Sequence, residues 1–325
     1  MHRPMLTIFF NPFGRLRSGW RLAIFLLGFI VLSMVWGSVL RTLYGLVSSY
    51  RLIPHAALVL EIAFKGGLLV IALGYGYVCA YFLEELPWRS LGVSFHKGWF
   101  RDLLIGSAIG FGALVVAVII ATAGRGLSFS RNHVEWTSIA RSMIGSAVML
   151  FVAAFSEEAM FRGYALQTLS RAKLAWLGVL ITFLLFGGAH LGNPNAAGLT
   201  FANTALAGLW LAVAYLRTRS LWLPLGVHWA WNWALGWFFG LPISGFNLIS
   251  QPLLNASDVG PRWLTGGDYG IEGGVACTIA LALCTLFLWK TSLVWADPEL
   301  RKLTSEENPV THPSVLSIRP ADDHA

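Results

Sequence analysis

The hydrophobic residues of this chain fall into long, nearly unbroken stretches that short polar segments separate. An apolar stretch of about 18 residues or more can cross the hydrocarbon core of a bilayer as an α-helix. Eight stretches of this kind predict an all-α fold, a polytopic integral membrane bundle of about eight transmembrane helices. The predicted helices span residues 22–40, 57–83, 103–123, 142–169, 174–192, 197–216, 221–241 and 275–295.

The composition supports this prediction and excludes a soluble fold. Hydrophobic residues make up 56% of the 325 residues and charged residues only 12%, about half the charged share of an average soluble domain. A soluble protein of this length has too little interior to bury so much apolar surface. The three cysteines lie in apolar stretches, so we expect buried thiols and neither a metal site nor a disulfide framework.

The predicted bundle divides the chain into three parts. Residues 1–21 form an N-terminal segment, residues 22–295 form the transmembrane bundle, and residues 296–325 form a polar tail that we expect to be disordered. The links between helices are mostly short, but residues 242–274 form a longer, glycine-rich link. We expect this link to be a plain connector, with a lid over a site as the alternative.

Lysine and arginine are distributed unequally between the two sides of the predicted bundle. The side with both termini holds roughly three times as many of them as the opposite side. By the positive-inside rule this side is cytoplasmic, so both termini are expected in the cytoplasm. The formal net charge of +7 then reflects topology and contact with anionic lipid. We therefore expect the lipid bilayer, and no nucleic acid, as a partner.

Several polar residues lie within three of the predicted membrane helices, where an ionisable group costs roughly 2.5–3.5 kcal/mol. Groups that are this costly to bury indicate a functional site when several of them occur in one bundle. They are Glu157, Glu158 and Arg162 in the fourth helix, His190 at the end of the fifth, where it follows the apolar Phe186 by four residues, and His228 and Asn232 in the seventh.

Helical spacing assigns structural roles to two pairs of charged residues. Glu158 and Arg162 are four residues apart and share a helix face, so we expect them to pair and to have a structural or orienting role. Glu61 and Lys65 in the second helix have the same spacing and predict a second structural ion pair. Glu157 points away from Arg162, which leaves its carboxylate free for chemistry.

The other motif residues are predicted to converge on this carboxylate. His228 and Asn232 lie one helical turn apart and point to one site, and Phe186 lies one turn from His190 and can wall it off. In the hairpin of the fourth and fifth helices, Glu157 and His190 differ in height by only about 5 Å. A carboxylate, two imidazoles and an amide can therefore meet inside the bilayer.

These residue types fit the hydrolysis of an acyl bond, which we expect to be a peptide bond. Glu157 can act as a general base, and the amide of Asn232 can donate to an oxyanion. His190 and His228 can donate hydrogen bonds or bind a metal ion such as Zn²⁺. Because no serine or cysteine beside a histidine offers a nucleophile, water is the expected attacking group.

In order and type, the three motifs resemble those of the CAAX-protease and bacteriocin-processing family of intramembrane proteases, also called the Abi family. The resemblance covers about residues 140–245, the expected catalytic core. The family patterns EExxxR, FxxxH and HxxxN correspond here to Glu157-Glu158-x-x-x-Arg162, Phe186-x-x-x-His190 and His228-x-x-x-Asn232.

The resemblance implies an intramembrane endopeptidase that acts on a peptide or protein. Glu157 would activate water with His190, while His228 and Asn232 would stabilise the oxyanion or help to hold a metal. The enzyme would be a metalloendopeptidase that uses Zn²⁺, our expectation, or a glutamate endopeptidase, the alternative. Its substrate would be a lipidated C-terminal peptide or a peptide precursor.

The resemblance also bears on location, and it leaves two other functions open. The residues after His190, Leu191-Gly192-Asn193, are similar to those of many bacterial members, so we expect a bacterial plasma membrane. One alternative is a non-catalytic immunity or scaffold protein with the same fold. The other is a secondary transporter or proton relay, in which the buried glutamate and histidine would titrate.

Overall fold

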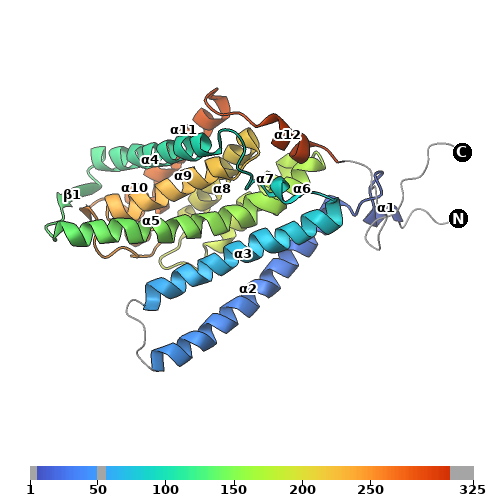
Figure 1. Cartoon of the computed structure of the whole chain (residues 1–325). Helices are drawn as coiled ribbons and strands as arrows, with labels where there is room; N and C mark the ends of the chain where they lie inside the picture. Colours follow the sequence, from blue (N-terminus) through green and yellow to red (C-terminus); the bar gives the residue numbers. More distant parts are fainter. Residues whose placement is uncertain (1–5, 50–55, 308–325) are drawn as a thin grey trace, which may run out of the picture.

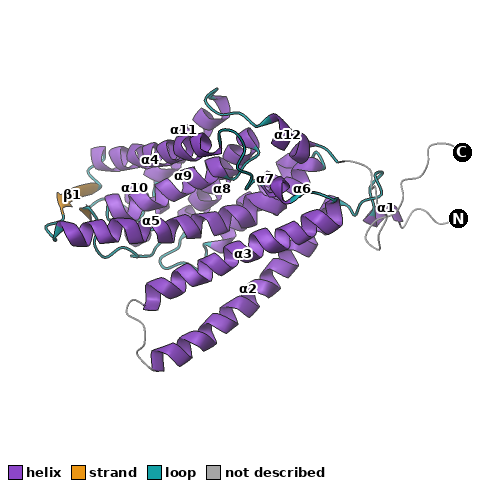
Figure 2. Ribbon diagram, viewed as in Figure 1, coloured by secondary structure: helices purple, strands orange, loops and turns teal. Residues whose placement is uncertain are grey.

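The computed structural model describes residues 6–49 and 56–307, which are almost entirely helical (Figures 1 and 2). Each of the eight predicted segments forms a helix. The protein is therefore a polytopic helical membrane protein, as the sequence predicts. Among the described residues, the helices long and apolar enough to cross a membrane are Ser18–Leu46, Val59–Glu84, Trp99–Ala123, Trp136–Arg171 and Gly198–Thr218, and the shorter apolar ones are Ala175–Ala189 and Val275–Lys290.

The helices follow one another with short connections. The α-helices are α1 (Leu6–Phe9), α2 (Ser18–Ser49), α3 (Ala56–Glu84), α4 (Trp99–Ala123), α5 (Trp136–Glu158), α6 (Leu166–Arg171), α7 (Ala175–Ala189), α8 (Gly198–Thr218), α9 (Trp222–Trp233), α10 (Arg262–Thr265), α11 (Val275–Lys290) and α12 (Pro298–Ser305). Two π-helical stretches, η2 (Ala159–Ala165) and η3 (Ala234–Phe238), extend α5 and α9, and short 3₁₀ turns form η1 (Trp88–Leu91), η4 (Gly267–Tyr269) and η5 (Ile271–Gly273).

Helix α9 lies in the bundle beside α4, and glycines let the two backbones approach closely. A Cβ atom at Gly106 would lie 2.3 Å from the carbonyl oxygen of Leu223, and one at Gly110 would lie 2.1 Å from that of Val227. Small residues at such positions permit the close helix packing that is common in membranes. Because Val227 precedes His228, this contact fixes the part of α9 that carries the candidate histidine.

Helix α5 continues through η2 into α6, with a change of course at Gly163 (φ −64°, ψ −109°). The double-glutamate motif lies where α5 passes into the π-helical turns of η2. Such π-helical insertions occur frequently at functional sites. Helices α2 and α3 lie side by side at one edge of the bundle (Figure 1), and α3 packs against α5 and η2.

A small β-sheet and a terminal helix depart from the predictions. Strands β1 (Leu127–Arg131) and β2 (Leu254–Asp258) pair antiparallel, with Leu127 opposite Asp258, whereas the predicted all-α fold includes no strand. The expectation of a disordered tail from residue 296 is wrong for its described part, because α12 packs on the bundle and buries Leu300 and Thr304. Residues 308–325 lie outside the described part of the chain.

Candidate active site

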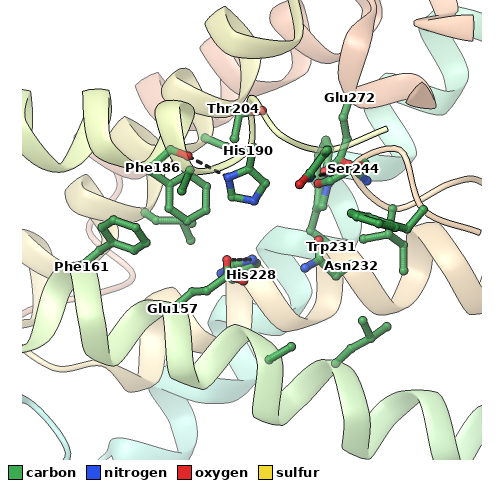
Figure 3. A pocket seen from close by; sticks show the side chains of 18 of the residues that line it. Glu157, Phe161, Phe186, His190, Thr204, His228, Trp231, Asn232, Ser244 and Glu272 are labelled. Atoms are coloured by element: carbon green, nitrogen blue, oxygen red, sulfur yellow. Dashed lines mark hydrogen bonds and ion pairs between the residues drawn. The ribbon is translucent and has the colours of Figure 1, made fainter. Parts of the chain in front are cut away.

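A cavity of about 560 Å³ opens inside the bundle, and every residue predicted to be catalytic lines it (Figure 3). Glu157 reaches it from the end of α5, and His190 from the end of α7. His228 and Asn232 reach it from α9, and Phe186 lines it as well. The fold therefore brings the three sequence motifs together around one space.

Glu158 and Arg162 form the predicted ion pair beside the cavity. Nη1 of Arg162 lies 3.0 Å from Oε1 of Glu158, and both side chains are completely buried. The Nη2 group of Arg162 donates to the carbonyl oxygen of Gly208 at 2.9 Å, which ties η2 to α8. Oε1 of Glu158 also lies 2.8 Å from Nδ1 of His228. A carboxylate paired with arginine accepts hydrogen bonds only, so Nδ1 of His228 carries a proton.

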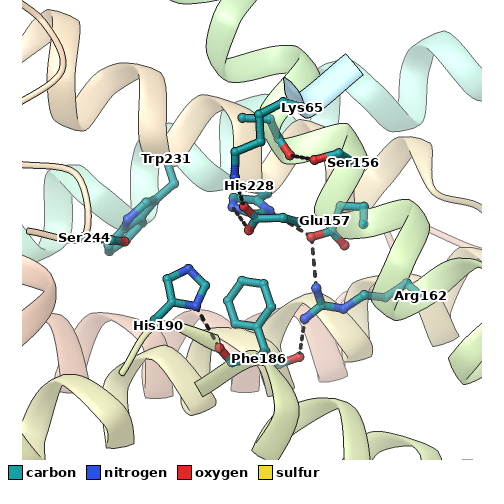
Figure 4. A network of polar contacts seen from close by, with 12 residues as sticks. Lys65, Ser156, Glu157, Arg162, Phe186, His190, His228, Trp231 and Ser244 are labelled. Carbon is teal, nitrogen blue, oxygen red and sulfur yellow. Dashed lines mark hydrogen bonds and ion pairs between the residues drawn. The ribbon is translucent and has the colours of Figure 1, made fainter. Parts of the chain in front are cut away.

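Glu157 lies inside the cavity, and its carboxylate faces both Lys65 and His228 (Figure 4). Its Oε1 atom is 3.2 Å from Nζ of Lys65, and its Oε2 atom is 3.8 Å from Nε2 of His228. The side chain of Glu157 is 23% exposed, whereas that of Glu158 is fully buried. Of the two adjacent carboxylates, only Glu157 is accessible to a bound molecule.

The predicted structural ion pair between Glu61 and Lys65 is wrong. The ammonium group of Lys65 bonds to Glu157 instead, and Glu61 lines the cavity. Lys65 pairs with Glu157 because α3 packs against α5 and η2, which brings the carboxylate of another helix within reach of its ammonium group.

His190 is oriented by the backbone of its own helix. Its Nδ1 atom lies 2.7 Å from the carbonyl oxygen of Phe186. A carbonyl only accepts, so Nδ1 carries the proton and Nε2 is left for the cavity. The buried ring of Phe186 packs against both imidazoles, with centroids 4.9 Å from His190 and 5.9 Å from His228. The guanidinium of Arg162 lies 4.7 Å from the same ring, so Phe186 separates Arg162 from His190 (Figure 4).

The glycine-rich link 242–274 forms part of the cavity wall, so the expectation of a plain connector is wrong. Ser244 and Glu272 from this link line the cavity (Figure 3), and sequence reasoning identified neither. No periodicity marks a functional residue in an irregular segment. Lys65 and Asn193 also line the cavity, and the sequence did not identify them as site residues. Lys65 could have been found as an ionisable residue inside a span, and Asn193 as a polar residue that closely follows His190.

The side chains around the cavity do not form a set that fits a zinc ion. Within residues 6–49 and 56–307, no three histidine, cysteine, aspartate or glutamate side chains come together so that they could hold a metal. A catalytic zinc site requires three such ligands, and the hydrogen bonds of both Nδ1 atoms leave Nε2 as the ring nitrogen of each histidine that could bind a metal. Zinc held by His190 and His228 therefore stays a prediction from the sequence.

Comparison with known proteins agrees with the resemblance seen in the motifs. Residues 139–234 match the family model described as type II CAAX prenyl endopeptidase Rce1-like. The match covers less than half of the chain and shows similarity to a family of CAAX-type endopeptidases. The matched segment carries Glu157, His190, His228 and Asn232, whereas Lys65, Ser244 and Glu272 lie outside it.

A curated relative and the solved structures add less. An uncharacterized 24.3 kDa protein of Escherichia coli is 40% identical to this chain over 83 residues, which cover 25% of this chain and 37% of that protein. No solved structure matches the chain.

Proposed function

We propose that the protein is an intramembrane endopeptidase that hydrolyses a peptide bond with a water molecule activated by Glu157 and His190. The main support is that the two adjacent glutamates have different surroundings. Glu158 is buried, and its carboxylate binds Arg162 and His228. Glu157 presents its carboxylate to the cavity, where Nε2 of His190 has no hydrogen-bond partner among the described residues.

In the first step Glu157 accepts a proton from water while the water oxygen attacks the carbonyl carbon of the scissile bond. Lys65 balances the charge of Glu157 and fixes Oε1, and Nε2 of His190 accepts the second hydrogen bond of the water. The product is a tetrahedral intermediate with an oxyanion. In the second step the C–N bond breaks, and protonated Glu157 gives its proton to the leaving amine.

Donors for the oxyanion come from α9. Asn232 offers its side-chain amide from the cavity wall, and preorganised donors of this kind are worth about 2.7–4 kcal/mol in related chemistry. His228 lies beside the same space, with its Nε2 atom 3.8 Å from Oε2 of Glu157 and its Nδ1 atom held by Glu158 at 2.8 Å.

The proposal extends to the substrate and the location of the enzyme. The charged groups lie in a cavity whose remaining wall is rich in apolar side chains, such as those of Met149, Leu150 and Leu281. Such a wall suits a peptide that enters from the membrane, either lipidated or as a membrane-associated precursor. We propose that both termini lie in the cytoplasm, on the basis of the arginine and lysine distribution. We propose a bacterial plasma membrane because Leu191-Gly192-Asn193 resemble the residues of many bacterial family members.

The test compares purified wild-type protein with Glu157→Gln in liposomes that contain a bacterial membrane-peptide extract. New peptide termini are counted by mass spectrometry. Glu61→Gln is the matched control, because Glu61 lines the same cavity but contacts neither histidine. We expect new termini with wild type and with Glu61→Gln, and none with Glu157→Gln. Identical termini from wild type and Glu157→Gln would remove Glu157 from the mechanism, and no new termini from wild type would favour a scaffold or a transporter.

A further inference from the structure

A tight turn of the link 242–274 lies against the segment that follows His190. Two backbone hydrogen bonds of 2.9 Å close the turn between Ile243 and Phe246. Ser244 has φ +46° and Gly245 has φ +88°, and the left-handed region is strained for a residue such as serine. A Cβ atom at Gly245 would lie only 2.2 Å from the carbonyl oxygen of Pro194. The turn is therefore pressed directly onto the segment behind His190.

Glu272 holds this strained turn in place. Its Oε2 atom accepts hydrogen bonds from the backbone N–H of Ser244 at 2.6 Å and from the hydroxyl of Ser244 at 3.0 Å. Its Oε1 atom accepts from the indole N–H of Trp231 at 3.0 Å. No lysine, arginine or histidine of the described residues forms an ion pair with Glu272. The carboxylate thus acts as an acceptor for three donors from two separate parts of the fold.

Ser244 and Trp231, the two residues that donate to Glu272, are each connected to a candidate catalytic histidine. On one side, the carbonyl oxygen of Ser244 accepts from the side-chain amide of Asn193 at 3.0 Å, and the backbone N–H of Asn193 donates to the carbonyl oxygen of His190 at 3.1 Å. On the other side, Trp231 precedes Asn232 on α9, one turn from His228. Figure 3 shows Ser244, Trp231 and Glu272 gathered on one side of His190.

We propose that Glu272 is a positioning residue for the hydrolysis. Through Ser244 and Asn193 it fixes the segment that carries His190, and through Trp231 it ties this segment to the helix that carries Asn232. This inference rests on the proposed function. It concerns a residue of the link, outside the segment 139–234 that matches the family model.

The first arm of the test needs no substrate. Hydrogen exchange of the backbone amides is measured by mass spectrometry in nanodiscs for wild type, Glu272→Gln and Asp268→Asn. The Gln amide replaces one acceptor oxygen with a donor, so either the bond to Trp231 or the bonds to Ser244 are lost, and the remaining bonds lose their charge assistance. We expect exchange in residues 187–197 and 241–248 to rise by about tenfold or more, the effect of one charge-assisted hydrogen bond.

Asp268→Asn is the matched control. It makes the same carboxylate-to-amide change in the same link, at an exposed ion pair with Arg262, and exposed pairs contribute little to stability. Its exchange should match that of wild type. Unchanged exchange of residues 187–197 in folded Glu272→Gln would overturn the inference even if the wild type cleaves no peptide, so the two proposals can fail separately.

The second arm measures cleavage of a fluorogenic peptide built on one site found in the liposome experiment. We expect Glu272→Gln to lower kcat about tenfold or more with KM within about twofold, because positioning acts on the reacting groups. Asn193→Ala should lower kcat similarly, and the double variant should be no worse than the poorer single variant. Glu272→Asp should recover part of kcat.

Asn193→Ala also keeps the inference testable if Glu272→Gln does not fold, because it breaks the same chain of contacts at a half-buried position of the cavity wall. Normal exchange and normal kcat in Asn193→Ala would overturn the proposed path to His190. Additive losses in the double variant, or a loss confined to KM, would overturn it as well.

Discussion

Replacement of Arg162 by alanine tests the buried framework on which the candidate site depends. The substitution removes the 3.0 Å ion pair with Glu158, the 2.9 Å hydrogen bond to Gly208 and the contact with the Phe186 ring. Glu158 and Arg162 are both fully buried, so the change leaves a carboxylate in the membrane without its cationic partner, held only by the N–H group of His228. Loss of one partner of a buried pair costs about 3–5 kcal/mol.

The assay is thermal unfolding of purified protein in detergent, together with peptide cleavage. A loss of that size lowers Tm by on the order of 10 °C, and cleavage should fall as well because Glu158 orients His228. Arg89→Ala is the control. It breaks an exposed pair with Glu299, which is worth about 0–1 kcal/mol, and should leave Tm and cleavage nearly unchanged.

A double variant separates stability from chemistry. Glu158→Met with Arg162→Met removes both charges, and apolar replacement of a whole buried pair is often neutral for stability. We expect its Tm to lie well above that of Arg162→Ala, while cleavage stays lost because Nδ1 of His228 has no acceptor. A Tm of Arg162→Ala within about 2 °C of wild type, the effect of less than 1 kcal/mol, would refute the pairing argument.

Two further predictions concern the carboxylate that activates water. Lys65→Met should lower kcat about tenfold with unchanged folding, because Glu157 loses the charge-assisted bond that fixes Oε1; a variant with normal kcat would show that Lys65 is dispensable. Cleavage should persist in 1,10-phenanthroline, because the described side chains do not present three metal ligands. Loss of cleavage that added Zn²⁺ restores would instead establish the metalloendopeptidase predicted from the sequence.

The sequence predicted those features that the bilayer or the helix geometry imposes locally. The bilayer fixes the length and composition of its helices, so all eight segments could be found without a structure. The pairing of Glu158 with Arg162 follows from their four-residue spacing. The convergence of Glu157 with the histidines was predictable because polar groups inside a membrane need one another.

Helical spacing predicted the wrong partner for Lys65, because a carboxylate on another helix was available. Glu61 lies one turn from Lys65, and such a pair stabilises an isolated helix by about 0.2–0.5 kcal/mol. Glu157 faces Lys65 from another helix inside the bundle, where the attraction between two charges is stronger because the effective dielectric constant is lower. The larger effect decides the pairing, and it depends on how α3 packs against α5, which no pattern within α3 encodes.

The prediction of a disordered tail was wrong at α12 for a different reason. The tail contains a helix-start motif, but its polar composition was given more weight. Asp297 caps the helix by accepting from the backbone N–H groups of Glu299 and Leu300, and Pro298 occupies the first helical position. An aspartate followed by proline is a recognised helix start. A local motif of this kind should therefore take precedence over the overall polarity of a tail.

Glycine content was the least informative property of the link 242–274. It indicates flexibility where the chain is free, but it equally indicates tight packing where two backbones meet. The second meaning holds here: a Cβ atom at Gly266 would lie 1.9 Å from the carbonyl oxygen of Gly270. A flexible glycine and a tightly packed glycine differ only in what lies next to them, and those neighbours are known only once the chain has folded. For this reason the role of Glu272, which binds Ser244 in the link and Trp231 on α9, could be inferred only from the structure.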